Sequence, residues 1–478
     1  MSAGAQIVDS RNRWEWIGLL LVLAMGLGAR LLNITYSLDG DEIFSSNLVA
    51  HSFTETLWLA FLDSPHPPLH NILLHAWTLL FGHGEFALRS LSLLFSIGFL
   101  VVAYALMRRV LPVWLALGCT ALLAFNPLLV FYGQQARPYA LIAFFAAWNI
   151  ERFLSVLEAP EDRRRQLHWA LSGLLLMYVQ YMGALVVGAG MLTVWFYRSP
   201  AWRGVTVLGV LTGLAMLAWM VAAAWYEQAR QDVVFGGFAW IGPPDINTFV
   251  WFFVALFGEF DALQVRWLML ALLIILGAYA VKLLRKRRLP AEHAYLVLLA
   301  LLVPLAAFAL SVAGPRSIFV PRQLIGSGIA FTALLGLGLN AMPRALGAVL
   351  LSALLAWVIY AFPNDGRDMT RQPWREIFAE LARAHEGVPM LAQEPWIFQP
   401  MGRYQPQGTP IKLVDALGVA DVKAPFLFVC RPLRCWLMDE PQRASRATLV
   451  FSRSLAQHPD EPSKFTDVRA YLVRPEPR

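Results

Sequence analysis

Residues 86–107 read FALRSLSLLFSIGFLVVAYALM, and Arg89 is the one charged side chain among them. A helix of this length crosses a hydrocarbon layer of about 30 Å. The stretch therefore predicts a membrane-spanning helix. Further apolar runs of spanning length lie at residues 16–34, 112–131, 139–157, 204–225, 264–284, 292–313, 322–342 and 345–362.

The composition agrees with a chain built for lipid. Of 478 residues, 58% are hydrophobic and 15% charged, more apolar than a soluble core of this size needs. The net charge of +7 lies mainly in short loops, where cations set topology, so we infer no nucleic-acid partner. The run at 16–34 lacks a small-residue cleavage pattern, and we expect it to stay as the first anchor.

Residues 168–197 are too long for one helix and admit two interpretations. A break at residues 178–183 would make a hairpin of two short helices, whereas a single helix would scatter the loop cations over both sides. With the hairpin, the arginine-rich loops fall on one side, as the positive-inside rule predicts. The hairpin gives about eleven spans and a cytoplasmic N-terminus.

The composition changes after residue 362. Charges of both signs appear, so we expect a transmembrane domain over 1–362 and a small periplasmic α/β domain over 363–478. Two β-prone runs and one helix are predicted in it, at 425–429, 447–451 and 374–384. Cys430 and Cys435 are close enough in sequence to bridge in an oxidising compartment, whereas Cys119 lies in an apolar run.

The first outer loop is rich in titratable groups. No Lys or Arg lies between Arg30 and Arg89, yet five of the nine histidines do: His51, His66, His70, His75 and His83. Apolar residues recur at helical spacing over 44–61 and again over 69–80. We expect two interfacial helices lying on the membrane.

Asp39-Gly40-Asp41-Glu42 opens the first of these helices. Carboxylates there could simply cap free N–H groups and complement the helix dipole. They could also do chemistry, but neighbouring helical residues point about 100° apart, so at most one of Asp41 and Glu42 faces a site. A divalent metal ion held by Asp41 and His66 is a further option, and no other cofactor is predicted.

Four arginines lie in or beside apolar runs on the outer half, against the positive-inside trend: Arg30, Arg89, Arg137 and Arg322. An arginine at mid-helix costs roughly 2.5–3.5 kcal/mol on insertion scales. Snorkelling would explain any one of them. A phosphate at the outer membrane edge would satisfy all four, because guanidinium groups bind phosphate oxygens in pairs.

Five short motifs carry a resemblance to a known family. They are LDGDEIF (38–44), DSPHPPLH (63–70), the segment 81–90 with Arg89, YGQQARPYAL (132–141) and FVPRQ (319–323). In this order they resemble the family-39-like branch of the C-type membrane glycosyltransferases, related to protein O-mannosyltransferases and the aminoarabinose transferase. The likeness covers residues 15–345. The last motif departs from the family, which usually carries Arg-Tyr where this chain has Arg322-Gln323.

The resemblance implies a fold and a set of site residues. It implies a catalytic carboxylate at Asp41, with Glu42 beside it. It also implies phosphate-binding arginines at Arg137 and Arg322, and we include Arg89 and Arg30 as further candidates for phosphate binding. Substrate-binding candidates in the matching motifs are His66, Gln134, Gln135 and Tyr139.

The resemblance also implies an activity, that of an inverting glycosyltransferase in a bacterial inner membrane. It would move a sugar from a polyprenyl phosphate donor to a lipid, glycan or protein acceptor on the periplasmic face. A transporter or flippase for a lipid-linked or anionic substrate is the alternative. A glycan ligase that uses lipid diphosphate donors is a further rival, and a non-catalytic sensor a third.

Overall fold

The computed structural model describes residues 2–32, 34–62, 66–229, 242–257, 262–287, 289–314, 317–364, 373–392, 394–405, 410–413, 425–430, 435, 445–453 and 468–474. The chain divides into two compact units. The first comprises Met1–Ile34 and Leu48–Asp365, and the second comprises Thr35–Asn47 and Gly366–Arg478. A short piece of the segment between α1 and α5 thus groups with the C-terminal residues.

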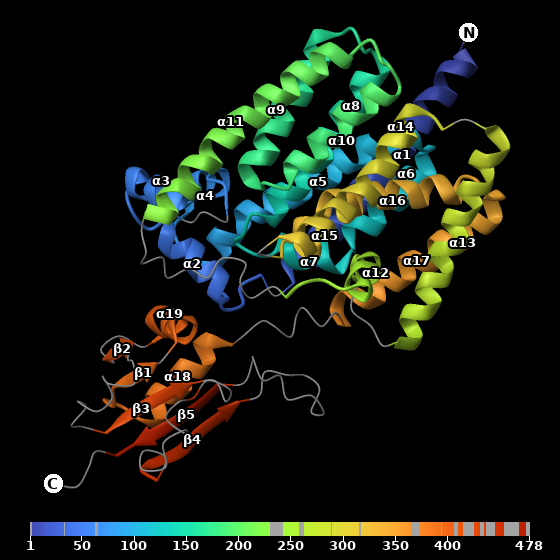
Figure 1. Cartoon of the computed structure of the whole chain (residues 1–478). Helices are drawn as coiled ribbons and strands as arrows, with labels where there is room; N and C mark the ends of the chain where they lie inside the picture. The colour runs from blue at the N-terminus through green and yellow to red at the C-terminus, as the bar shows by residue number, and fades with distance from the viewer. Residues whose placement is uncertain are drawn as a thin grey trace. The chain divides into compact units, whose positions relative to one another are not determined.

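The first unit is a bundle of helices (Figure 1). Its described elements are α1 (Ser2–Leu31), α3 (Phe53–Leu62), α4 (Leu69–Phe81), α5 (Glu85–Val110), α6 (Val113–Ala124), α7 (Pro127–Gly133), α8 (Tyr139–Glu158), α9 (Arg163–Val179), α10 (Gly183–Phe196), α11 (Trp202–Ala229), α12 (Ile246–Ala255), α13 (Ala262–Lys286), α14 (Ala291–Val297), the π-helix η1 (Leu298–Leu302), α15 (Val303–Ala313), the 3-10 helix η2 (Pro321–Gln323), α16 (Ile325–Leu339) and α17 (Arg344–Asn364).

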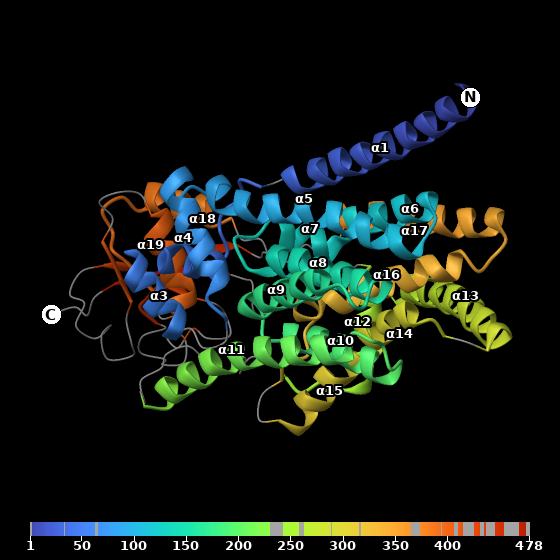
Figure 2. The same cartoon turned by 90° about the horizontal axis from the view of Figure 1, so that it is seen from above.

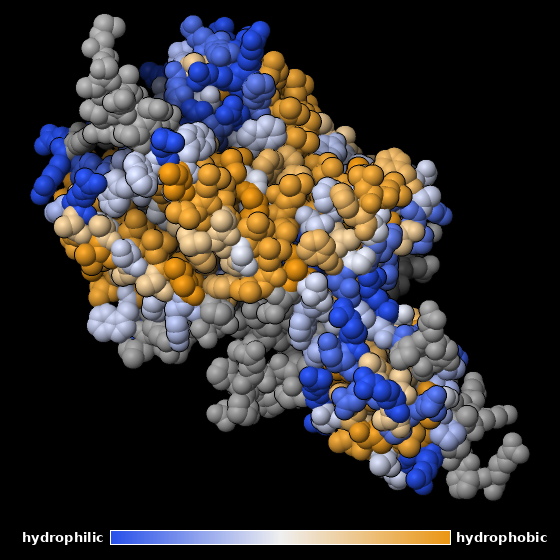
Figure 3. Space-filling view, turned by 180° about the vertical axis from the view of Figure 1, so that it is seen from behind, coloured by the Kyte–Doolittle hydropathy of each residue, from blue (hydrophilic) through white to orange (hydrophobic). Residues whose placement is uncertain are grey.

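Several of these helices can cross a membrane. Within the described ranges, 7 are long and apolar enough, or up to 8 if the bent pair α6–α7 is one span. The pair bends by 58° where Asn126 caps α7, its side chain accepting the Leu129 N–H at 3.0 Å. The helical unit also presents a broad hydrophobic surface (Figure 3). The predicted polytopic helical class is confirmed, and the count of about eleven spans stays a prediction.

The hairpin predicted within 168–197 is present. The helix α9 ends at Val179 and α10 begins at Gly183, so the break falls on residues 180–182. Asn149 of α8 is buried and donates to the Trp169 carbonyl at 3.0 Å and to Ser172 Oγ at 3.1 Å. These bonds fix α9 against α8, and α5, α8 and α9 lie side by side (Figures 1 and 2).

The segment between α1 and α5 differs from the prediction. Residues 44–61 form two helices, α2 (Gly40–Leu48) and α3, rather than one. Ser52 Oγ accepts the Glu55 N–H at 3.4 Å, and Glu55 Oε2 accepts the Ser52 N–H at 3.0 Å. This reciprocal capping box starts a new helix at Phe53. The apolar spacing continues across the break, which is why periodicity alone predicted one helix.

The second unit contains a mixed sheet (Figure 1). Its described elements are α2, α18 (Trp374–Ala384), β1 (Met390–Ala392), α19 (Pro395–Tyr404), β2 (Ile411–Leu413), β3 (Phe426–Cys430), β4 (Ala447–Arg453) and β5 (Val468–Val473). The described strands lie in the order β2-β1-β3-β5-β4. The strand β1 runs parallel to β2 and β3, whereas β5 is antiparallel to β3 and β4. Such a sheet confirms the predicted small α/β domain.

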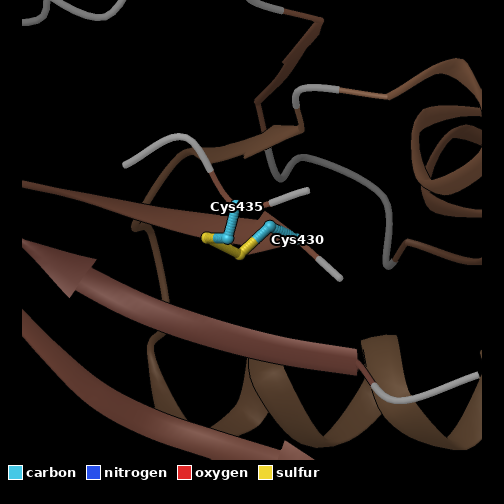
Figure 4. Close-up of a disulfide and its surroundings, with 2 residues drawn as sticks. All are labelled: Cys430 and Cys435. Atoms are coloured by element: carbon cyan, nitrogen blue, oxygen red, sulfur yellow. A yellow bond between two sulfur atoms is a disulfide. The ribbon is translucent and has the colours of Figure 1, made fainter. Parts of the chain in front are cut away.

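Apolar side chains of α18 build the core of this unit. Trp374, Ile377, Phe378 and Leu381 recur at helical spacing and are buried in one cluster with residues of β1, β3 and β5. The predicted helix at 374–384 and the predicted strands near 425–429 and 447–451 are confirmed. Cys430 at the end of β3 is disulfide-bonded to Cys435 (Figure 4), so the predicted bridge is present.

Candidate functional site

Arg137 lies in the short connection between α7 and α8. Its side chain is 7% exposed, and its Nη2 is 3.4 Å from His66 Nε2. The backbone is fixed as well, because the Arg137 N–H donates to the Gln135 carbonyl at 2.8 Å and its carbonyl accepts from Ser92 Oγ at 3.4 Å. Two predicted site residues, Arg137 and His66, are therefore brought together.

Arg322 lies on η2 and contacts the first residue of α8. Its guanidinium carbon lies over the Tyr139 ring, 5.6 Å from the centroid. Tyr139 follows Arg137 by two residues, is 5% exposed, and its ring packs on Tyr132 at 4.4 Å between centroids. A guanidinium over an aromatic face is attracted by the ring quadrupole. The pairs Arg137–His66 and Arg322–Tyr139 thus meet the chain at two nearby positions, 137 and 139, and these four residues are called here the arginine corner.

Gln134 has a structural role in the same connection. Its Nε2 donates to the carbonyls of Arg30 at 3.0 Å and Leu32 at 2.6 Å, beside the end of α1. The last carbonyls of a helix have no partner within it, so this side chain caps α1. Gln135 next to it is half-buried. Their predicted substrate contacts stay predictions.

Arg30 and Arg89 are held by oxygens of the protein. Arg30 is 0% exposed and donates to Ser96 Oγ at 2.5 Å and to the carbonyls of Gly26 at 3.0 Å and Ala124 at 2.7 Å. Arg89 is 5% exposed and donates to the Ile34 carbonyl at 2.8 Å. These contacts tie α1 to its neighbours, and they favour a structural role over the phosphate contact predicted for both residues.

The histidines of α4 are buried. Burial and the nearby charge of Arg137 lower the pKa of His70 to about 3, so its ring is neutral at physiological pH. His75 Nδ1 lies 3.3 Å from Thr56 Oγ1 and 3.2 Å from the Val49 carbonyl, which ties α4 to α3. Within the described part of the chain, no group of three or more His, Cys, Asp or Glu side chains could hold a metal ion.

The two candidate carboxylates lie on α2 in the second unit. Asp39 is the residue before the helix: its carbonyl accepts the Ile43 N–H at 2.9 Å, and its Oδ1 accepts the Glu42 N–H at 2.8 Å. Glu42 Oε2 in turn accepts the Asp39 N–H at 3.1 Å, and Glu42 is 1% exposed. This is a capping box. It assigns the Glu42 carboxylate to the cap, while Asp41 is exposed.

The carboxylates and the arginine corner belong to different units. Asp41 and Glu42 group with the second unit, and His66, Arg137 and Arg322 with the first. The metal site predicted from Asp41 and His66 therefore stays a prediction.

A pocket beside the arginine corner was not predicted from the sequence. It is lined by residues of α8, α9, α10, α15 and α16, and by Gln180 in the hairpin break and Gln323 beside Arg322. Most lining residues are apolar, among them Ile142, Leu176 and Leu324. Gln180 interrupts an apolar hairpin, and a buried amide requires a polar partner. This residue was the signal in the sequence from which the pocket could have been predicted.

These features define a polytopic helical membrane protein with a small α/β domain. No protein-family model matches the sequence, and no curated protein matches it significantly. Solved structures do match, however. The chain superposes on ArnT from Cupriavidus metallidurans in the apo state with a TM-score of 0.61 and 14% identity, over 97% of this chain and 99% of that one.

Two further solved structures have a similar fold. ArnT from the same organism bound to undecaprenyl phosphate matches with a TM-score of 0.57 and 14% identity, over 95% and 98% of the two chains. The oligosaccharyltransferase AglB from Archaeoglobus fulgidus, in complex with an inhibitory peptide and a dolichol-phosphate, matches with 0.54 and 11%, over 92% of this chain and 73% of that one. The chain therefore has the fold of the C-type membrane glycosyltransferases that its motifs resemble.

Proposed function

We propose that this protein is an inverting glycosyltransferase that uses a polyprenyl-phosphate-linked sugar as donor. The observation that carries the proposal is the arginine corner, within a fold shared along nearly its whole length with a protein that has been crystallised with undecaprenyl phosphate. Fold alone does not define an activity. The two arginines of the corner suit such a donor, because guanidinium groups bind phosphate oxygens in paired hydrogen bonds.

The proposed reaction is a single displacement. The acceptor hydroxyl oxygen attacks the anomeric carbon, and the bond from that carbon to the phosphate oxygen breaks, its electron pair leaving with the lipid phosphate. Asp41 takes the hydroxyl proton as general base, a role typically worth about 10²–10⁴ in rate. Arg137 and Arg322 bind the departing phosphate and stabilise its developing charge. Attack opposite the leaving group inverts the anomeric centre.

We place this reaction on the periplasmic side of a bacterial inner membrane. The arginine-rich loops favour a cytoplasmic N-terminus under the positive-inside rule. The disulfide between Cys430 and Cys435 supports an oxidising compartment for the C-terminal domain. The sugar acceptor would be a lipid, a glycan or a protein.

Lipid analysis of the purified protein tests the donor class. Protein extracted in mild detergent should carry a polyprenyl phosphate or its glycoside, which mass spectrometry of the bound lipid identifies. Undecaprenyl phosphate added to delipidated protein should bind, and Arg137→Ala should weaken that binding about tenfold or more, since a charged hydrogen bond contributes about 1.5–3 kcal/mol. Arg137→Lys should restore it only in part, because lysine lacks the paired donors.

A matched control is Arg203→Ala, which removes an exposed arginine that lies over the Trp202 ring, 5.2 Å from its centroid. It should leave binding of undecaprenyl phosphate unchanged. Equal affinity in wild type, Arg137→Ala and Arg322→Ala would remove the arginine corner from the donor site, and the proposed function would lose its main support.

A further inference from the structure

The segment Thr35–Asn47 is part of the C-terminal unit although it is encoded near the start of the chain. It contains Asp39, Asp41 and Glu42, and its apolar residues Leu38 and Ile43 are 0% exposed. Two hydrogen bonds from the helix α18 region reach it: the Arg375 N–H donates to Ser37 Oγ at 3.2 Å, and Arg375 Nη2 donates to the Thr35 carbonyl at 3.5 Å.

Tyr404 at the end of α19 makes the shortest of these contacts. Its hydroxyl accepts the Leu38 N–H at 2.6 Å. The guanidinium carbons of Arg375 and Arg403 lie 5.8 Å and 6.0 Å from its ring centroid, so two cations stabilise the position of the ring. Leu38 is the residue immediately before Asp39, which caps α2. The hydroxyl therefore fixes the backbone at the point where the capping box begins.

Arg403 holds the other end of α2. Its Nη1 donates to Ser46 Oγ at 3.1 Å, and Ser46 is 2% exposed. Contacts before the first turn and in the last turn together fix both the position of α2 and its rotation about its axis. Rotation matters because a turn of about 100° would exchange the direction of Asp41 for that of Glu42.

We infer that the C-terminal domain is a positioning element for the catalytic carboxylate, with Tyr404 and Arg403 as the positioning residues that set the direction of Asp41. The inference rests on the proposed function for the role of Asp41. The docking of α2 on the domain stands on its own contacts. Hydrogen exchange measures the docking, and kinetics measure the role of Asp41.

Hydrogen exchange on the full-length protein tests the docking. Tyr404→Phe keeps the ring that the two arginines contact and removes the hydroxyl that accepts the Leu38 N–H. Exchange in peptides covering residues 35–47 should rise roughly two- to tenfold, because the net contribution of one such bond is modest. Ser46→Ala, which removes the partner of Arg403 from the α2 side, should act in the same direction. Tyr471→Phe on β5, the same change at a residue 5% exposed in the same domain, should not.

Kinetics test the positioning. With the polyprenyl phosphate sugar identified from the co-purified lipid, Tyr404→Phe should lower kcat roughly three- to tenfold and leave the KM for the donor nearly unchanged. In an Asp41→Asn background the same change should have no further effect, because a residue that acts by aiming a carboxylate has nothing to aim once the carboxylate is gone. Tyr471→Phe should keep wild-type kcat in both backgrounds.

The possible failures are distinguishable. Unchanged exchange at residues 35–47 in both Tyr404→Phe and Ser46→Ala overturns the docking and with it the inference. Faster exchange with an equal loss of kcat in the presence and absence of Asp41 shows a merely structural role and also overturns it. Wild-type turnover in Asp41→Asn overturns the proposed mechanism, whatever the exchange experiment shows.

Discussion

Comparison of the variants Asp41→Asn and Glu42→Gln distinguishes a catalytic general base from a carboxylate that only caps the helix. Both carboxylates lie in the first turn of α2, so each variant removes one negative charge near the positive end of the same helix dipole. That loss costs about 0.3–1 kcal/mol in either case. The amide introduced by Glu42→Gln keeps a carbonyl oxygen to accept the Asp39 N–H, so the capping box survives. The two variants therefore lose the same interaction with the helix dipole.

Their effects on turnover should differ widely. A structural cost of at most about 1 kcal/mol changes kcat by no more than roughly fivefold even if all of it falls on the transition state. Loss of a general base lowers kcat by about 10²–10⁴, which corresponds to about 2.7–5.4 kcal/mol. We expect Asp41→Asn to fall in the second range and Glu42→Gln in the first, with donor affinity nearly unchanged in both.

The assay measures single-turnover transfer from the polyprenyl phosphate sugar together with donor binding. Loss of turnover in Glu42→Gln with normal turnover in Asp41→Asn would exchange the two roles and contradict the capping assignment of Glu42. Normal turnover in both would make the first-loop carboxylates caps only, and the displacement mechanism would fail.

Three further predictions concern topology, stability and pH. Alkaline phosphatase fused after Pro363 should be active, because the positive-inside rule places that residue outside; activity of a cytoplasmic reporter there instead would refute the orientation. Ser52→Ala should destabilise α3 by about 0.5–2 kcal/mol through loss of its cap, measured as a lower unfolding midpoint, with unchanged donor binding as the control. Because the pKa of His70 is depressed to about 3 in the fold, the unfolded chain binds more protons than the folded one below pH of about 6.5. Stability should therefore fall as pH drops from about 6.5 toward 3, and His70→Gln should flatten a plot of Tm against pH over this window.

Features that extend over a whole helix could be predicted from the sequence. Apolar runs of spanning length predict helices because lipid leaves the backbone no other partner, and the helices follow those runs. The break at residues 180–182 was predicted from loop charge rather than from local propensity. The helix at Trp374–Ala384 has apolar residues on one face only, and its predicted bounds are those observed.

Short-range and long-range polar contacts were harder to predict. The capping boxes at Asp39-x-x-Glu42 and Ser52-x-x-Glu55 follow a known pattern, but apolar periodicity outweighed it at residue 52. The role of Gln134 as a cap for α1 depends on the chain returning to that helix after a hundred residues. Spacing in sequence carries no signal for such contacts.

The hydrogen bond between Leu38 and Tyr404 joins residues 366 positions apart, and it limits how the chain can be threaded through the bilayer. Two groups bonded within one compact unit must emerge on the same face of the membrane. The number of crossings between them must therefore be even. If one short helix between Leu38 and Tyr404 is interfacial and not spanning, a second helix must change its assignment as well. A single change would put Leu38 and Tyr404 in different compartments.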